Sequence, residues 1–465
     1  MSRFNTHYDK WDSKRVKRQF AQLVTLSVPI ILQRLGIMTL GIVDTAMVAR
    51  YSTIEVGYQG IANSAIASTL IVATIGLLMG TMVLTSNAYG AKDHKRCGRI
   101  WRRSMPYSLA IGFIGFVICW FGEPILSALG QTDDIARGGG EVAKVLSIGI
   151  LMVGPMLASQ FFLEGINRPL PGMVFMFIAN ILNIGLNWMF VWGHLGFDPM
   201  GAVGSAWATS IIRTFLAVSM LLYILITVDR EKYGIMDKIN MKWSLWSKHR
   251  HIGYAAGFTN TVEHLGFAAL YVMAGFLGTI SLGALTIAFT VFGVPFMICY
   301  GVAGATSVRV GIAMGRGDHQ DMALAGLCGL AFNGMICLPL MAILFFFPSQ
   351  IANLFSQDAL LVAATIPLMA LSVWMLFFDT AQTIIGNALR GAQDIWMPAI
   401  FYVFCYTLVM IPLAWILTFE LDHGAIGLIE CVIYASFLSL VLLSARFFYL
   451  TLVKKQFHDD RQQAD

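Results

Sequence analysis

Long apolar runs recur along the whole chain and alternate with short polar segments. About 20 consecutive apolar residues cross the hydrocarbon core of a bilayer as a helix, so each run predicts one membrane span. Spans of about 28 residues or more exceed this length, and those helices are expected to tilt, bend or project beyond the bilayer. Pro29, Pro155, Pro295 and Pro367 are candidate kink points. The pattern predicts twelve spans, at about 22–49, 56–88, 101–121, 143–166, 170–193, 201–228, 251–276, 282–313, 323–346, 361–388, 395–418 and 425–450.

The composition supports an all-α integral membrane protein. Of the 465 residues, 57% are hydrophobic and only 12% are charged, with a mean hydropathy of +0.71; soluble proteins carry about 25% charged residues. The net charge of +5 does not indicate nucleic-acid binding, because the basic residues gather at one membrane face. The seven cysteines form no CxxC pair, and we expect small core residues rather than disulfides or metal ligands. Residues 1–20 are polar and basic without a cleavage site, so the first span is expected to remain.

The basic residues also predict the orientation in the membrane. They gather in the N-terminal tail, in the loop that follows the second span and in the loop that follows the sixth, whereas acidic residues predominate on the other face. Loops rich in lysine and arginine stay in the cytoplasm. Both termini are therefore expected to be cytoplasmic, which agrees with an even number of spans.

The two halves of the chain repeat each other in the same orientation. Residues 53–57 match 279–283, residues 90–94 match 315–319, and residues 201–204 match 424–427, so the offset drifts only from 226 to 223 residues. Chance matches of short Gly/Ala motifs are the alternative, but three in register argue against chance. Transporters with such repeats alternate access by moving two lobes. We expect tails at 1–21 and 451–465, an N-lobe at 22–228, a connector at 229–250 and a C-lobe at 251–450.

A few polar groups lie inside the apolar spans. Asp44 has no lysine or arginine within five residues, and a carboxylate at the centre of a membrane helix costs roughly 2.5–3.5 kcal/mol, so such groups usually mark an ion or substrate path. The alternative for each intramembrane polar group is a purely structural hydrogen bond between helices, worth about 0.6 kcal/mol. The other intramembrane groups are three asparagines on one helix face, at Asn180, Asn183 and Asn187, and two further acids, Glu263 and Asp379.

The basic residues inside spans are fewer. Arg34 is the only one that we place deep in a span, and it lies too far along the helix from Asp44 to favour direct pairing. Glu164 and Arg168 are predicted to be interfacial anchors at a helix end. Buried acids permit proton or cation exchange, because one carboxylate can hold a proton, a sodium ion or a cationic substrate but not all together. The 25 methionines and 12% aromatic residues would suit flat, lipophilic cations.

The chain resembles the multidrug and toxic compound extrusion family, in particular its bacterial NorM-type branch, over about residues 20–450. The motifs that carry the resemblance are residues 43–47 (VDTAM), 182–187 (LNIGLN), 201–204 (GAVG) with 208–209 (AT), 308–311 (VRVG) with Gly315 and Gly317, and 379–382 (DTAQ) with 389–394 (LRGAQD). The resemblance implies twelve helices in two pseudo-symmetric six-helix lobes. It also implies efflux of organic, often cationic compounds against inward proton or sodium flow.

The resemblance further implies which residues couple the ion. Asp44, Asn183 and Asn187 would form an N-lobe protonation site, with Asn180 and Thr209 as neighbours. In the C-lobe, Glu263 and Asp379 would form a cation site, with a possible Na⁺ bound to these two acids. Gln382 and Met375 are the expected neighbours of this C-lobe site. Met375 stands where NorM-type members commonly have a tyrosine, which leaves the choice between sodium and protons open.

The resemblance leaves two other classes of function to weigh. A flippase of related architecture that moves a lipid-linked sugar would need a cationic cavity for a pyrophosphate. A membrane enzyme could use the Asp93–His94 and Asp318–His319 pairs, but the sequence offers no nucleophile motif, and these aspartates are expected to cap helices or pair with arginines. We therefore expect a transporter rather than an enzyme, without a cofactor, as a monomer in the bacterial cytoplasmic membrane.

Overall fold

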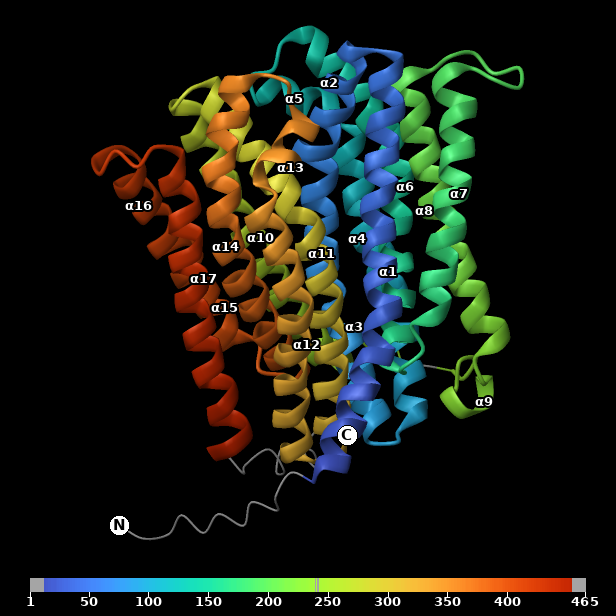
Figure 1. Cartoon of the computed structure of the whole chain (residues 1–465). Helices are drawn as coiled ribbons and strands as arrows, with labels where there is room; N and C mark the ends of the chain where they lie inside the picture. Colours follow the sequence, from blue (N-terminus) through green and yellow to red (C-terminus); the bar gives the residue numbers. More distant parts are fainter. Residues whose placement is uncertain (1–11, 239, 241, 454–465) are drawn as a thin grey trace.

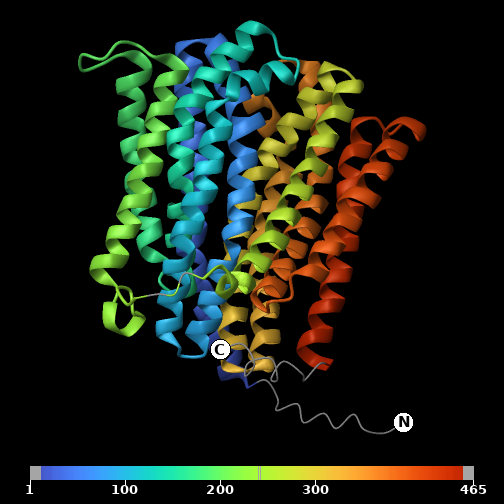
Figure 2. The ribbon, with the colours of Figure 1, turned by 180° about the vertical axis from the view of Figure 1, so that it is seen from behind.

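The computed structural model describes residues 12–238, 240 and 242–453, and the regular elements in this part of the chain are all helices. Figures 1 and 2 show them as a bundle in which the N-terminal half, blue to green, lies beside the C-terminal half, yellow to red. The first turn of α1 and the last turns of α17 lie at the same end of the bundle (Figure 1). This placement fits an even number of membrane crossings.

The N-terminal half contains six long helices. The second is continuous from Thr53 to Gly90 and includes one π-helical segment, and a short helix, α5, lies between the third and the fourth. The elements are α1 (Ser13–Tyr51), α2 (Thr53–Ile61), η1 (Ala62–Ala67), α3 (Ser68–Gly90), α4 (His94–Trp120), α5 (Gly122–Ala128), α6 (Asp133–Gly165), α7 (Leu170–Trp192) and α8 (Gly201–Thr227).

The C-terminal half follows the same plan after a short connector. The connector holds α9 (Arg230–Tyr233) and the 3₁₀ helix η2 (Trp243–Trp246). The remaining elements are α10 (Ser247–Phe276), α11 (Thr279–Arg316), α12 (His319–Phe346), α13 (Pro348–Phe355), α14 (Ala359–Gly391), α15 (Trp396–Val403), η3 (Phe404–Val409), α16 (Met410–Trp415), η4 (Ile416–Glu420), α17 (Ala425–Phe448) and η5 (Tyr449–Val453).

Eleven helices within the described residues are long and apolar enough to cross a membrane. The twelfth, α10, has 30 residues and is about 45 Å long, but it begins with the polar sequence SKHRH and carries Glu263 at its centre. It runs among the other long helices in both views (Figures 1 and 2). The predicted fold of twelve transmembrane helices in two six-helix lobes is confirmed.

Some helices begin earlier than the hydropathy pattern predicts. Helix α1 begins at Ser13 rather than at about 22, and α4 begins at His94 rather than at about 101. The Asp93 side chain caps α4 by accepting a hydrogen bond from the backbone N–H of Arg96 at 2.9 Å. All but one of the basic residues that the sequence assigned to a loop after the second span therefore lie on a helix; only Lys92 lies in the turn. Hydropathy locates the membrane segment, not the helix end.

The repeat predicted from short motifs extends to whole elements. Helix α2 begins at Thr53 and α11 at Thr279, whereas α6 begins at Asp133 and α14 at Ala359, so both pairs are 226 residues apart. The short helices α5 and α13 occupy the same place in the two halves, after the third and the ninth long helix. The buried apolar residues form two large clusters, one mainly from each half.

The backbones of the two halves approach closely where α3 crosses α11. A Cβ atom at Gly90 would meet the carbonyl oxygen of Ile312, and a Cβ atom at Gly315 would meet the carbonyl oxygen of Asn87. Two glycines at equivalent positions of the repeat therefore let these backbones touch. Near the same end, the Arg15 guanidinium on α1 lies 2.6 Å from both the Asp318 and the Asp321 carboxylates.

The cysteine prediction is also confirmed within the described residues. All seven cysteines are free and buried. Cys299 and Cys337 lie in contact, with their sulfurs 3.4 Å apart. They pack as small core side chains.

Candidate functional site

The N-terminal bundle encloses Asp44, which is 6% exposed. Oδ1 of Asp44 accepts hydrogen bonds from the amide groups of Asn183 at 3.0 Å and Asn187 at 2.7 Å. Oδ2 accepts a third from the hydroxyl of Thr209 at 2.6 Å. The carboxyl comes from α1, the amides from one face of α7 and the hydroxyl from α8. The structure thus brings together four residues that the sequence placed in one site.

Asn180 does not belong to this hydrogen-bonded group, although the sequence predicted it as a neighbour. Its amide donates to the carbonyl oxygens of Gly36 at 3.2 Å and Met176 at 2.9 Å. Gly36 lies two turns before Asp44 on α1. Asn180 therefore joins α7 to α1 without touching the carboxyl.

Arg213 is a residue of this site that the sequence reasoning missed. It lies one turn after Thr209 on α8, and its charge interacts with that of Asp44. Its Nη1 is buried and has no hydrogen-bond partner among the described residues. The prediction that Arg34 is the only basic residue deep in a span is wrong. A search for single charges within each apolar run would have found Arg213.

Arg34 and Glu164 form a second buried polar group in the same bundle. Their side chains lie 3.9 Å apart and are 7% and 1% exposed, and the Gln160 amide donates to Glu164 at 2.8 Å. The prediction of Glu164 as an interfacial anchor is therefore wrong. The Arg34 guanidinium also lies 5.5 Å from the ring centroid of Tyr300 on α11, in the other half.

The C-terminal bundle encloses Asp379, which is 1% exposed. Its Oδ1 accepts hydrogen bonds from Tyr406 at 2.8 Å, from Gln382 at 3.1 Å and from Ser436 at 3.1 Å. The donors come from η3, α14 and α17. Gln382 is a neighbour of the acid, as predicted. Ser439 donates to the Gln382 carbonyl oxygen at 3.3 Å and extends the polar network.

A tyrosine reaches Asp379 by a route that the sequence did not reveal. Met375, one turn before the acid, is fully buried and packs in the apolar core. The hydroxyl of Tyr406 comes instead from η3, a π-helical segment between α15 and α16. Such segments often occur at functional sites. A buried tyrosine hydroxyl needs a partner, so Tyr406 in an apolar span was the available signal.

Glu263 lies on α10 and is only partly buried. Its carboxyl interacts electrostatically with Asp379 and with Arg390, but no hydrogen bond joins the two acids in the described part of the chain. Arg390 donates to Asn260 on α10 at 3.1 Å. The two acids predicted for the C-lobe thus lie within electrostatic range, with one arginine close to them.

The two Asp–His pairs considered for an enzyme have structural roles. Asp93 caps α4, and Asp318 caps α12 by accepting from the backbone N–H of Asp321 at 2.9 Å. Asp318 also pairs with Arg15, rather than with an arginine of its own half. The capping prediction is confirmed, and these aspartates are explained by helix structure.

Buried carboxyls inside two repeat-related helix bundles are typical of one class of protein, the membrane transporters. The comparisons with known proteins agree. The sequence model of the family named MatE matches residues 29–189 and again 255–416, one match in each half. This chain belongs to that family, the multidrug and toxic compound extrusion transporters.

Relatives and solved structures cover nearly the whole chain. A Caulobacter vibrioides protein described as probable multidrug resistance protein NorM is 34% identical over 430 residues, 92% of this chain and 90% of the relative. Multidrug resistance protein PmpM of Pseudomonas aeruginosa is 26% identical over 409 residues, 86% and 84% of the two chains. The crystal structure of the eukaryotic MATE transporter AtDTX14 matches with a TM-score of 0.86 at 19% identity, over 95% of this chain and 97% of that one.

The family membership decides between the classes considered from sequence. The chain is a multidrug efflux transporter, and its family is one of transporters rather than enzymes. The comparisons give no support to a lipid-linked-sugar flippase. Each arginine near these sites lies close to an acid: Arg34 to Glu164, Arg213 to Asp44 and Arg390 to Glu263.

Proposed function

We propose that the protein is an antiporter that expels organic, often cationic and aromatic compounds in exchange for inward protons or sodium ions. It acts as a monomer in the bacterial cytoplasmic membrane, with both termini in the cytoplasm. Asp44, Glu263 and Asp379 couple the ion flow to export. The observation that carries the proposal is the buried Asp44 carboxyl with its three hydrogen-bond donors.

The surroundings of Asp44 favour a proton over sodium as its ion. A sodium ion needs several oxygen ligands, whereas Asp44 is surrounded by amide N–H groups and a donating hydroxyl. The positive charge of Arg213 would also repel a metal cation. A proton needs only one lone pair of the carboxylate, and Oδ2, which accepts a single hydrogen bond, has one to offer. Because a neutral carboxyl accepts less strongly than a carboxylate, protonation weakens the hydrogen bonds from Asn187, Asn183 and Thr209. This weakening is the local change that loosens α1 from α7 and α8.

The C-lobe offers a different charge balance. Glu263 and Asp379 carry two negative charges, and Arg390 supplies one positive charge near them. The hydroxyl oxygens of Tyr406 and Ser436 also contact Asp379. This site can therefore hold one cation, either sodium or a proton, where the N-lobe site is already neutral. An organic cation would compete for the same negative charge, and mutual exclusion at one carboxylate suffices for antiport.

The electrical driving force is adequate for export. One charge that crosses about 100 mV releases about 2.3 kcal/mol. When the exchange moves one net charge inward, that energy corresponds to roughly a fiftyfold concentration ratio of the exported compound, since about 1.4 kcal/mol is a factor of ten. A proton gradient would add to it.

The test uses purified protein in liposomes and ethidium as a fluorescent cation. A proton gradient and a sodium gradient are imposed separately, and ethidium movement is followed for the native protein and for Asp44→Asn, Glu263→Gln and Asp379→Asn. Asp133→Asn, at the exposed start of α6, is the matched control. We expect each of these three variants to lose coupled transport and the control to keep it. Ethidium export that survives all three substitutions, singly and combined, would sink the proposal.

A further inference from the structure

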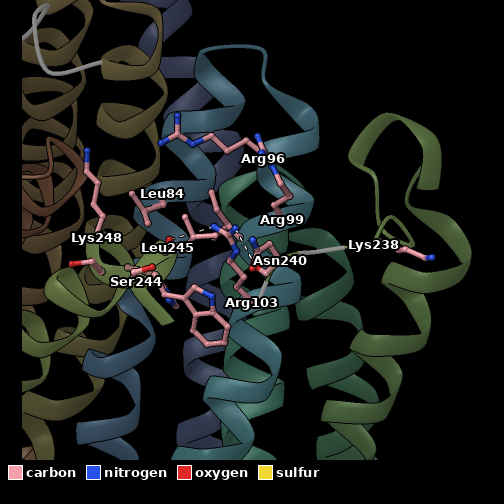
Figure 3. A pocket seen from close by; sticks show the side chains of 13 residues that line it. Leu84, Arg96, Arg99, Arg103, Lys238, Asn240, Ser244, Leu245 and Lys248 are labelled. Atoms are coloured by element: carbon pink, nitrogen blue, oxygen red, sulfur yellow. Dashed lines mark hydrogen bonds between the residues drawn. The ribbon is translucent and has the colours of Figure 1, made fainter. Parts of the chain in front are cut away.

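A basic cavity lies at the end of the bundle where the connector joins the two halves. It has a volume of about 740 Å³ and is lined by α3 and α4 on one side and by η2 and the start of α10 on the other. Three arginines, Arg96, Arg99 and Arg103, recur along one face of α4. Figure 3 shows them on the same helix, with Lys248 on the opposite side beyond Leu84.

The three arginines of α4 have no acidic residue beside them in the described lining of this cavity. Among the described residues its lining includes no aspartate or glutamate, and the connector residues Ile239 and Met241, outside the described part, carry no charge by sequence. Asp93 is the nearest acid to Arg99, at 3.8 Å across an exposed contact, which is worth little. Arg103 uses its guanidinium to hold the connector by donating to the carbonyl of Leu245 at 3.3 Å. The remaining arginines keep donors for a ligand.

Two buried nitrogen atoms in the lining also have no partner. Trp246 and His249 are each 5% exposed and line the cavity. The indole Nε1 of Trp246 and Nδ1 of His249 have no hydrogen-bond partner in the described part of the chain. Nε2 of His249 already contacts the hydroxyl of Thr81 at 3.0 Å. Unpartnered buried donors cost free energy unless a water or ligand satisfies them.

We propose that this cavity binds the phosphate group of an anionic phospholipid. Guanidinium groups recognise phosphate oxygens through charge-assisted hydrogen bonds, and the indole N–H of Trp246 adds a neutral donor. Leu84, Ile100 and Leu245 supply apolar surface beside the charges, which suits the glycerol and first acyl carbons of a lipid rather than a free ion. Basic pockets between helices at a membrane surface recognise such headgroups.

The site joins elements on both sides of the connector. Because α3 and α4 belong to the N-terminal bundle and α10 to the C-terminal one, a bound headgroup would hold this arrangement of the two halves together. A ligand that binds one conformation stabilises it by mass action. The lipid would therefore raise the thermal stability of the purified protein.

The experiment measures the melting temperature of the purified full-length protein in detergent. Short-chain phosphatidylglycerol, phosphatidylcholine of the same chain length, and inorganic phosphate are titrated separately. The test variant is Arg96→Gln/Arg99→Gln, which spares the arginine that holds the connector. The matched control is Lys92→Gln/Lys95→Gln, which removes two charges from the same end of α4 outside the cavity. Trp246→Phe removes the indole N–H together with part of the buried ring system.

We expect phosphatidylglycerol alone to raise the melting temperature of the native protein. Its apparent affinity should fall about tenfold in the double arginine variant, less in Trp246→Phe, and not in the lysine control. Equal stabilisation by both lipids, or an equal loss in the control, would overturn the proposal. Full stabilisation by inorganic phosphate would overturn the lipid as the source of the phosphate group. Should the double arginine variant fail to fold, the lipid comparison on the native protein and Trp246→Phe decide.

Discussion

The hydroxyl of Tyr406 offers the sharpest test of the C-lobe site. It donates to Asp379 at 2.8 Å and lies 3.1 Å from both the Gln382 amide and the Ser436 hydroxyl. Tyr406→Phe deletes this one oxygen and keeps the ring, which stacks on Tyr402 with centroids 5.9 Å apart. The substitution therefore removes the hydrogen bonds of this hydroxyl while keeping the packing of the ring.

The size of the effect follows from the kind of hydrogen bond that is lost. Hydrogen bonds between membrane helices average about 0.6 kcal/mol, whereas those to a charged group are worth roughly 1.5–3 kcal/mol. These values correspond to about threefold and to tenfold or more in cation binding. The sign depends on the ion. A sodium site loses an oxygen ligand, so the half-saturating sodium concentration rises. A carboxylate that loses a donor attracts a proton more strongly, so the half-saturating proton concentration falls.

The assay is ethidium transport into or out of liposomes at varied sodium concentration and at varied pH. Tyr271→Phe is the matched control, because Tyr271 lies on α10 in the same bundle and packs against Phe289 at 5.5 Å between centroids. We expect Tyr406→Phe to change half-saturation for one ion by at least about threefold, and the control to leave both unchanged. Unchanged half-saturation for both ions in Tyr406→Phe would refute the role given to this hydroxyl.

Three other predictions concern pairing, packing and orientation. Arg34→Gln leaves the buried Glu164 carboxyl without its ion-pair partner, so the free energy of unfolding should fall by about 3–5 kcal/mol. The double variant Arg34→Gln/Glu164→Gln should recover most of this loss. Gly90→Val sets a side chain against the backbone of α11, so its melting temperature should fall clearly; an unchanged value would contradict the close crossing. The native cysteines are buried and should not react with a membrane-impermeant thiol reagent. Leu195→Cys should react with this reagent in intact cells, whereas Lys92→Cys should react only after permeabilisation. The reverse pattern would contradict the proposed orientation.

Most of the fold was predictable because each membrane span is a contiguous run of apolar residues in the sequence. Each apolar run must become a helix in lipid, where the backbone has no other way to satisfy its hydrogen bonds. The pattern says less about where a helix ends in water. The segment from His94 to about residue 101 is helical because Asp93 caps it. An average of hydropathy over a window of residues does not detect a helix cap. The span predicted at 251–276 is confirmed by α10, although α10 is less apolar than the other eleven long helices in the described part of the chain.

The site could be predicted from spacing only where several of its residues lie on the same helix. The spacing of Asn183 and Asn187 places both on the face of α7 that meets Asp44. Arg213 and Tyr406 come to their sites from other helices, and no spacing along the chain connects them to an acid. Asn180 shows the converse, because it shares the helical face and yet bonds to the backbone of α1.

The duplicated scaffold carries two sites that are not duplicates. At the repeat offset of 226 residues, the position that corresponds to Asp44 is Leu270, and the position that corresponds to Asp379 is Val153. Tyr406 corresponds to Asn180, which donates to the backbone rather than to an acid. Packing of apolar faces fixes the helix positions in both halves, but it does not fix which helix carries the charge. The two bundles can therefore have similar shapes and different ion preferences.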